Sequence, residues 1–155
     1  MPVGNDTFAY RSRLPHLRKR DKSYSVTFCT RRRREMSPTT RDIVLACCIG
    51  EHRKHCWLHC GVVMPDHVHL VLTPHDGVDL TMLVGQIKGR LLFLINRERN
   101  RRGSFWQRDS FDHIVRADED LEKKIEYVCG NPVRKGLVAK CDDYPWLWRA
   151  WFSAG

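Results

Sequence analysis

Short stretches in which apolar residues alternate with polar ones, or run together between turn-forming residues, predict β-strands in this chain. The predicted strands cover residues 24–30, 57–64 and 67–72, and a further short strand begins at Ile114 and Val115. Pro65-Asp66 separates the second strand from the third. Because proline presets the backbone for the first corner of a turn, these two strands are expected to form a hairpin. Residues 101–112 are expected to form a loop.

Apolar residues that recur every three or four positions predict three helices. They cover residues 39 to about 55, residues 81–99, and a segment that begins at Asp118 and is ended by Gly130 and Pro132. Thr39 or Thr40 is expected to cap the first helix. The order strand, helix, hairpin, helix, short strand, helix favours an α+β fold, and its simplest version is a ferredoxin-like sandwich with an antiparallel sheet and helices packed on it.

Neither an internal repeat nor a linker interrupts the 155 residues, so we expect a single domain. Residues 1–22 form a basic N-terminal arm in this interpretation, and residues 144–155 form a tryptophan-rich tail. No apolar run approaches the roughly 18 to 20 residues of a membrane span, and the N-terminal segment lacks the apolar centre of a secretory signal. We therefore expect a cytoplasmic protein, with no membrane partner.

Positive charge is the first feature that points to a partner. Lys and Arg number 27 against 18 Asp and Glu, which gives a formal net charge of +9. The basic residues cluster at residues 18–20, 31–34 and 97–102. Because guanidinium groups fit phosphate oxygens and each neutralised phosphate releases counterions, nucleic acid is the expected partner. A solvated basic face and attraction to an anionic membrane surface are the alternatives.

Seven cysteines are an odd number, and several lie in apolar runs, so most are expected to be free residues of the core. One segment offers a different interpretation, because His52, His55, Cys56, His59 and Cys60 lie within nine residues. These side chains could belong to a zinc-stabilised binding module. However, a structural zinc site usually has a two-residue knuckle such as C-x-x-C and a second ligand pair elsewhere, and neither is present.

His67 and His69 lie two residues apart on the second strand of the predicted hairpin. Alternate residues of a strand point to the same face, so both imidazoles can bind one divalent cation and leave open positions on it. Val68, Leu70 and Leu72 would then pack into the core on the other face. The alternative is two ordinary strand histidines, one hydrogen-bonded and one exposed.

The last predicted helix carries a second group of polar residues. Its apolar stripe begins at Leu121, and on a helical wheel Tyr127, Asn131 and Lys124 fall at about 240°, 280° and 300° from that residue. These three side chains point away from the stripe and are free to meet a ligand. A half-exposed tyrosine and an asparagine that ends a helix before Pro132 are the alternative.

The combination of these motifs is more specific than either alone. MPDHVHLVL, residues 64–72, is followed much later by YVCGNPVRKGLV, residues 127–138. Together they resemble the REP-associated tyrosine transposases, relatives of the insertion-sequence-200-like transposases in the HUH (His-hydrophobic-His) superfamily of single-strand nucleases. The resemblance runs from about Tyr24 to about Pro145 and includes IKGR, FWQRDSFDHIVR and DYPW.

The resemblance implies an active site. His67 and His69 would bind a divalent metal, Mg²⁺ or Mn²⁺, and Asn131 would complete the site. Tyr127 would attack a phosphate of single-stranded DNA, form a 5′-phosphotyrosine bond and release a 3′-OH, so that the strand could later be rejoined without ATP. Lys124 or a metal-bound water could assist deprotonation of the tyrosine.

The resemblance also implies the substrate, single-stranded DNA that carries a palindromic hairpin of the REP type. Trp106 or Phe105 could stack on a base, and basic side chains would follow the backbone. The candidate DNA-contacting residues are Arg31, Arg32, Arg33, Lys88, Arg90, Trp106, Lys124 and Arg134. The protein would be a monomer or a homodimer. The alternative function is a non-catalytic nucleic-acid-binding regulator on the same scaffold, which would not need His67, His69 and Tyr127 together.

Overall fold

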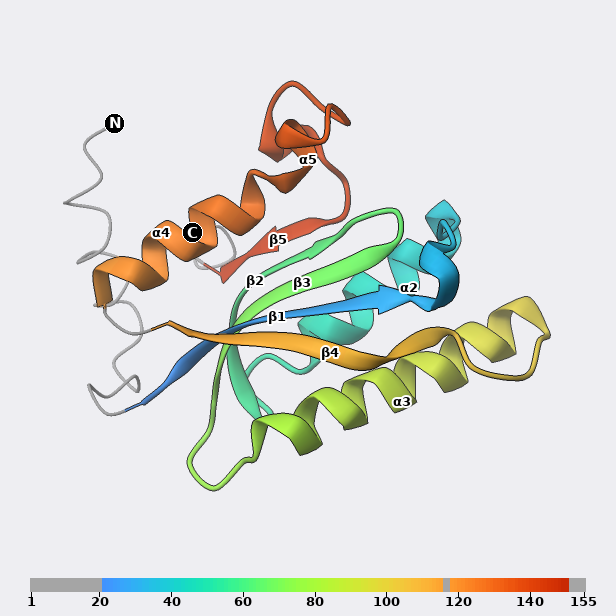
Figure 1. The fold of residues 1–155 in the computed structure, drawn as a ribbon, viewed down its shortest axis with the longest axis horizontal. Helices are drawn as coiled ribbons and strands as arrows, with labels where there is room; N and C mark the ends of the chain where they lie inside the picture. Colours follow the sequence, from blue (N-terminus) through green and yellow to red (C-terminus); the bar gives the residue numbers. More distant parts are fainter. Residues whose placement is uncertain (1–20, 116–117, 151–155) are drawn as a thin grey trace.

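Five strands form one antiparallel sheet in the computed structural model of the protein, in the order β4-β1-β3-β2-β5. The structure describes residues 21–115 and 118–150 (Figure 1). The strands are β1 (Ser23–Thr30), β2 (Cys56–Val63), β3 (His67–Pro74), β4 (Trp106–Val115) and β5 (Leu147–Arg149). The predicted strand at residues 24–30 and the predicted hairpin around Pro65-Asp66 are confirmed.

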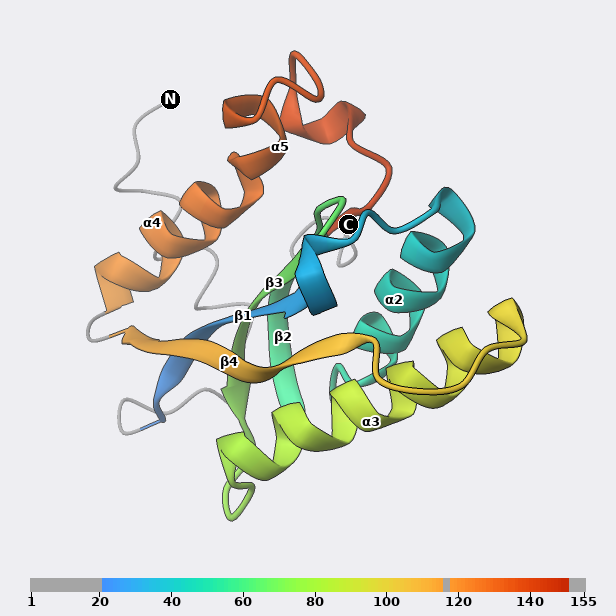
Figure 2. The same cartoon turned by 45° about the vertical axis from the view of Figure 1, so that its right-hand side comes forward.

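Helices cover both faces of this sheet. They are α2 (Pro38–Gly50), α3 (Leu80–Arg99), α4 (Asp118–Cys129) and the short α5 (Asn131–Arg134), with single 3₁₀ turns at η1 (Arg31–Arg33) and η2 (Cys141–Asp143). Helices α2 and α3 pack on one face and α4 on the other (Figures 1 and 2). Strands β1 to β4 lie in the sheet order β4-β1-β3-β2, and α2 and α3 are the helices that connect β1 to β2 and β3 to β4. This topology confirms the predicted ferredoxin-like α+β arrangement.

The sheet separates two hydrophobic cores, and β3 contributes to both. Val68, Leu70 and Leu72 pack into the core beneath α2 and α3, as predicted. His67 and His69 lie on the opposite face, because successive residues of a strand point to opposite sides. That face packs against the apolar stripe of α4, so the two histidines lie on the α4 side of the sheet.

A β-bulge at His59 changes which residues of β2 face each core. The register with β3 shifts between Leu58 and Cys60, so Leu58 packs under α2 and α3, whereas Cys60 packs under α4. His59 is fully buried, and its Nε2 lies 2.7 Å from Oγ1 of Thr73. Within the described residues no group of three or more His, Cys, Asp or Glu side chains could hold a metal ion, so the zinc alternative has no structural support.

Two predicted boundaries were wrong. The first helix begins after Ser37, whose hydroxyl accepts a hydrogen bond from the amide of Thr40, and it ends at Gly50 rather than near residue 55. The predicted loop over residues 101–112 is mostly β4. This edge strand exposes most of its side chains, so no apolar alternation marks it in the sequence.

The tryptophan-rich tail docks on the domain as far as residue 150. β5 pairs with β2 as the outermost strand of the sheet. The hydroxyl of Tyr144 donates a 2.6 Å hydrogen bond to the carbonyl of Val63, and Nε1 of Trp146 donates one of 2.8 Å to Asp42. The rest of the tail, and the predicted N-terminal arm up to residue 20, lie outside the described residues, so the single-domain assignment over the whole chain stays a prediction.

Two further expectations concern the state of the cysteines and the presence of membrane-spanning segments. All seven cysteines are free, and Cys29, Cys48, Cys56, Cys60 and Cys129 are buried, which confirms that most of them are core residues. No helix among the described residues is long and apolar enough to cross a membrane.

Candidate active site

A groove of about 540 Å³ lies where the α4 side of the sheet meets α4 and α5. Side chains from β1, η1, β3, β4 and both helices line it. They are Ser25, Thr27, Arg33, His67, His69, His113, Lys124, Tyr127, Val128, Asn131, Arg134 and Lys135. We call it the central groove. It brings together the two histidines, the tyrosine and the asparagine that the sequence singled out.

His67 and His69 stand side by side in the central groove, with ring centroids 4.7 Å apart and rings almost perpendicular. Nδ1 of His67 lies 2.6 Å from Oδ1 of Asp66, and Nδ1 of His69 lies 2.8 Å from Oγ1 of Thr27, its partner across the β1–β3 ladder. Both rings are therefore held through Nδ1. No hydrogen bond from the described residues reaches either Nε2 atom, so each Nε2 can serve as a ligand.

Asp66 is itself held in its ionised form. Burial alone would raise its pKa, but hydrogen bonds from His67 and Arg33 outweigh this effect and lower it. Nε of Arg33 lies 2.9 Å from Oδ2 of Asp66. Because an ionised carboxylate only accepts hydrogen bonds, Nδ1 of His67 must be the donor, and its Nε2 keeps a free lone pair.

The surroundings keep both imidazoles neutral. Burial lowers the pKa of His67, although its bond to Asp66 acts in the opposite direction. Burial, together with the nearby His67, Lys124 and Arg134, lowers the pKa of His69 to about 4. Metal ions bind only the neutral ring, so both residues are in the required state at neutral pH.

The donor set fits a catalytic divalent cation. Histidines that bind metals usually donate their other ring N–H to an acceptor. His67 does so to Asp66, and the hydroxyl of Thr27 is able to accept from Nδ1 of His69. His67 and His69 would supply two nitrogen ligands, and the amide oxygen of Asn131, which lines the same groove, is a candidate for a third. In this structure that oxygen accepts a 2.6 Å hydrogen bond from Arg134.

Tyr127 projects from α4 into the central groove, with 59% of its surface exposed. The guanidinium of Arg134 lies 3.9 Å from the centroid of its ring, and the ammonium of Lys124 lies 5.2 Å from it. Two cations beside one phenol can balance the negative charge of a phenolate or of a phosphate that approaches it. The helical-wheel prediction for Tyr127 and Lys124 agrees with this placement.

Arg134 reaches the tyrosine because α4 ends at a glycine. Its Nη2 donates 2.6 Å hydrogen bonds to the carbonyl of Tyr127 and to the side chain of Asn131. A Cβ atom at Gly130 would lie only 2.7 Å from Nη1 of Arg134. The absence of a side chain at Gly130 thus lets the guanidinium fold back over the end of the helix. Asn131 follows as the first residue of α5, so the predicted helix end is confirmed.

The structure divides the predicted DNA-contacting residues. Arg33, Lys124 and Arg134 line the central groove. Arg31 and Arg32 line a separate hollow on the other side of η1.

The other three candidates lie elsewhere. Lys88 donates hydrogen bonds to the carbonyls of Gln107 and Arg108 at 2.9 and 3.3 Å, so it fastens α3 to β4. Arg90 is exposed on α3. Trp106 is only 7% exposed and packs edge-on against Phe28 in the core, so the predicted stacking on a base is not supported.

Three residues that line the central groove or contact its histidines were not predicted from the sequence: Thr27, His113 and Asp66. Thr27 could have been found only from the strand register, which places it opposite His69. His113 lies in β4, between the predicted loop over residues 101–112 and the short strand expected from Ile114. Asp66 was interpreted as a turn residue alone, although its position next to His67 was the available signal.

Comparisons with known proteins found a matching family model and similar proteins. A family model described as "Transposase IS200 like" matches residues 18–131. A REP-associated tyrosine transposase of Haemophilus influenzae is 29% identical over 94 residues, which cover 54% of this chain and 53% of the relative. One of Escherichia coli K12 is 26% identical over 89 residues, which cover 57% and 51%. The chain spans about half the length of these curated relatives.

A solved structure of a REP-associated tyrosine transposase bound to a REP hairpin has the same fold. It superposes with a TM-score of 0.69 at 23% identity, over 84% of this chain and 80% of that chain.

Proposed function

Because the chain belongs to the family of IS200-like transposases, we propose that it is a metal-dependent endonuclease and strand transferase for single-stranded DNA, with Tyr127 as the nucleophile. The observation that carries the proposal is the meeting of Tyr127, His67, His69 and Asn131 in one groove.

In the proposed reaction, the phenolate oxygen of Tyr127 attacks a phosphorus atom of the DNA backbone. A bond forms between this oxygen and the phosphorus, while the bond to the 3′ oxygen of the preceding nucleotide breaks. The products are a 5′-phosphotyrosine and a free 3′-OH. Because the bond energy is kept in the phosphotyrosine, attack by another 3′-OH reverses the step and joins two strands.

Each side chain has a definite task in this scheme. Arg134 and Lys124 lie against the ring of Tyr127 and balance the charge of the phenolate and of the incoming phosphate. His67 and His69, oriented by Asp66 and Thr27, would hold Mg²⁺ or Mn²⁺ together with Asn131. When bound, such an ion polarises the scissile phosphate and steadies the charge that develops on it.

The substrate must be single-stranded at the cut, since a strand has to leave a duplex to enter the groove. Both curated relatives are named REP-associated tyrosine transposases, and the solved structure holds a REP hairpin. We extend this substrate class, single-stranded DNA with a small palindromic hairpin, to the present chain. Action on chromosomal repeats of this kind would place the protein in the cytoplasm, at the nucleoid.

A denaturing gel tests the proposal. The protein is incubated with end-labelled single-stranded oligonucleotides that carry the palindromes flanking its own gene, with Mg²⁺ or Mn²⁺. We expect a covalent protein–DNA band that is lost with chelator and in Tyr127→Phe. Tight binding without such a band over the whole set of oligonucleotides would instead favour the non-catalytic binding module.

A further inference from the structure

A second basic site lies outside the central groove, between η1 and the end of α3. Its lining includes Arg31, Arg32, Arg34, Arg99, Arg101 and Arg102, together with Asn96, Ser104 and Phe105. We call it the arginine pocket. Its volume is about 270 Å³, and none of its eleven lining residues is acidic. Among the described residues, no ion pair joins any of the six arginines to a carboxylate.

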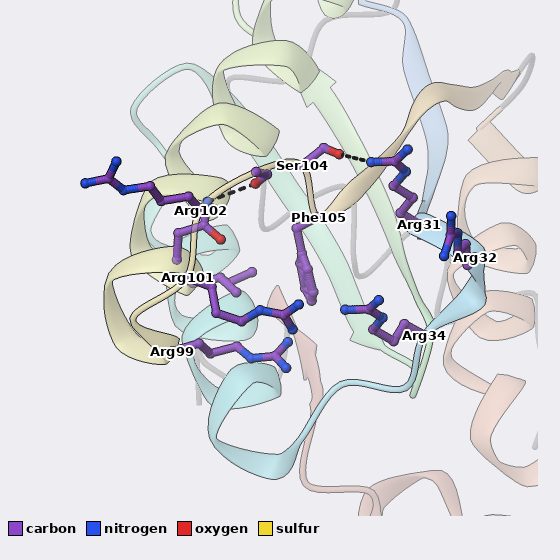
Figure 3. Close-up of a pocket in the computed structure, with 11 residues that line it drawn as sticks. Arg31, Arg32, Arg34, Arg99, Arg101, Arg102, Ser104 and Phe105 are labelled. Atoms are coloured by element: carbon purple, nitrogen blue, oxygen red, sulfur yellow. Dashed lines mark hydrogen bonds between the residues drawn. The ribbon is translucent and has the colours of Figure 1, made fainter.

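Three guanidinium groups converge in this pocket. Figure 3 shows Arg34 pointing from the η1 side toward Arg99 and Arg101 on the α3 side, whereas Arg102 points away from them. Like charges directed at one another are unfavourable unless an anion lies between them, so this arrangement is typical of a phosphate-binding site.

The walls of the arginine pocket are tied together before any ligand binds. The amide of Arg31 donates a 2.8 Å hydrogen bond to the carbonyl of Phe105, and its Nη1 donates one of 2.7 Å to Oγ of Ser104. On the other side, Nδ2 of Asn96 donates a 3.0 Å hydrogen bond to the carbonyl of Gly103. The pocket is therefore preformed, which reduces the entropy lost on binding.

The backbone of η1 connects the two sites. Arg32 and Arg33 have φ angles of 59° and 53°, in the left-handed region that costs a residue with a side chain about 1–2 kcal/mol. This strained turn places Arg33 at the central groove and in an ion pair with Asp66, while Arg32 and Arg34 line the arginine pocket. Such strain is often retained where a function needs it.

We propose that the arginine pocket binds backbone phosphates of the DNA strand that flanks the reacting nucleotide, so that one strand crosses η1 between the two sites. This inference rests on the proposed function. The pocket would read charge and not sequence, because its aromatic residue, Phe105, is 9% exposed and lies 5.8 Å from the guanidinium of Arg99. A base has no free ring to stack on there.

The salt dependence of DNA binding tests this proposal. The protein carries Tyr127→Phe and is kept in chelator, and its affinity for fluorescent oligothymidylate of about 25 nucleotides is measured by anisotropy between about 50 and 200 mM salt. Replacing Arg34, Arg99 and Arg101 with glutamine should reduce the slope of log K against log salt by about 2, since each contact to a single strand contributes about 0.7. Oligoadenylate should give the same reduction.

A matched control removes three exposed positive charges that lie outside both sites, with Arg53→Gln, Lys54→Gln and Lys140→Gln. Arg53 and Lys54 are exposed and precede β2, at the end of this strand far from η1. This control should keep the wild-type slope. All the replaced side chains are exposed, so thermal melts should stay unchanged, and Arg101→Gln alone should reduce the slope by about 0.7.

Equal slopes for the two triple variants would overturn the proposal, as would a reduction seen with only one of the two oligonucleotides. Another outcome would assign the pocket to a free polyphosphate instead. In that case inorganic triphosphate at low micromolar concentration would inhibit binding of oligothymidylate, and Arg101→Gln would abolish this inhibition without changing the slope of DNA binding. The covalent-band assay reports on Tyr127 separately, so failure of the proposed function and failure of this inference are distinguishable.

Discussion

Oγ1 of Thr27 lies 2.8 Å from Nδ1 of His69, across the β1–β3 ladder. This contact holds the imidazole through Nδ1, and no hydrogen bond from the described residues occupies its Nε2. The same strand register that forms the sheet therefore orients a proposed metal ligand.

Thr27→Val should weaken binding of Mn²⁺ by about 10- to 100-fold, because the valine keeps the shape of the side chain and loses the hydroxyl. Isothermal titration calorimetry of the Tyr127→Phe protein measures this directly. Thr27→Ser retains the hydroxyl and should bind Mn²⁺ nearly as wild type does. Equal affinities for the valine and serine variants would show that the contact does not orient His69.

Gly130→Ala should slow formation of the covalent product by about tenfold, since the new Cβ would displace Arg134 from the ring of Tyr127. The displaced atom is the far end of a flexible side chain, so the fold should be kept. Gly89→Ala in α3 is the matched control, because a Cβ there meets nothing within 4 Å. It should leave the rate unchanged and stabilise the helix by about 0.5–1 kcal/mol. A wild-type rate in Gly130→Ala would exclude this role of Arg134.

In metal-free protein His69 should titrate near pH 4 instead of its usual 6.5, because burial and nearby cations disfavour the charged ring. Between these values the unfolded chain binds a proton that the folded chain does not. Stability is therefore complete above pH 6.5 and declines as the pH falls toward 4. NMR of the imidazole protons in chelator gives the titration midpoint, and His69→Gln should reduce the slope of stability against pH. A midpoint near 6.5 would contradict the described burial of this ring.

Arg32→Gly should leave the free energy of unfolding unchanged or raise it by up to about 1 kcal/mol, because glycine adopts a φ near +59° without strain. Arg32→Ala keeps that strain and should be less stable than the glycine variant. Urea denaturation compares the two. If both variants lost the same stability, the left-handed conformation of η1 would not be strained.

Much of this architecture could be predicted because burial leaves a pattern in the sequence. The apolar stripe from Leu121 places α4 on the sheet, and the same periodicity turns Tyr127 away from the core. Strand alternation likewise puts His67 and His69 on one face. These relationships are local, since they depend only on the period of one element.

The remaining features depend on contacts between distant segments. β4 is an edge strand with mostly exposed side chains, so it has no apolar pattern, and His113 went unnoticed with it. The pairing of Thr27 with His69 needs the register of two strands that lie 42 residues apart at this contact. The arginines of residues 31–34 divide between two sites because Arg32 and Arg33 adopt left-handed backbone conformations. The composition of this segment does not reveal those conformations.

Mapping the covalent attachment site would show which tyrosine of this chain is the nucleophile. After reaction with single-stranded DNA and Mn²⁺, nuclease and trypsin digestion leave a short nucleotide remnant on one peptide, which mass spectrometry identifies. We expect the remnant on the peptide of residues 125–134, which contains Tyr127 and none of the other three tyrosines of the chain. A remnant on Tyr10, Tyr24 or Tyr144, or its persistence in Tyr127→Phe, would contradict this expectation.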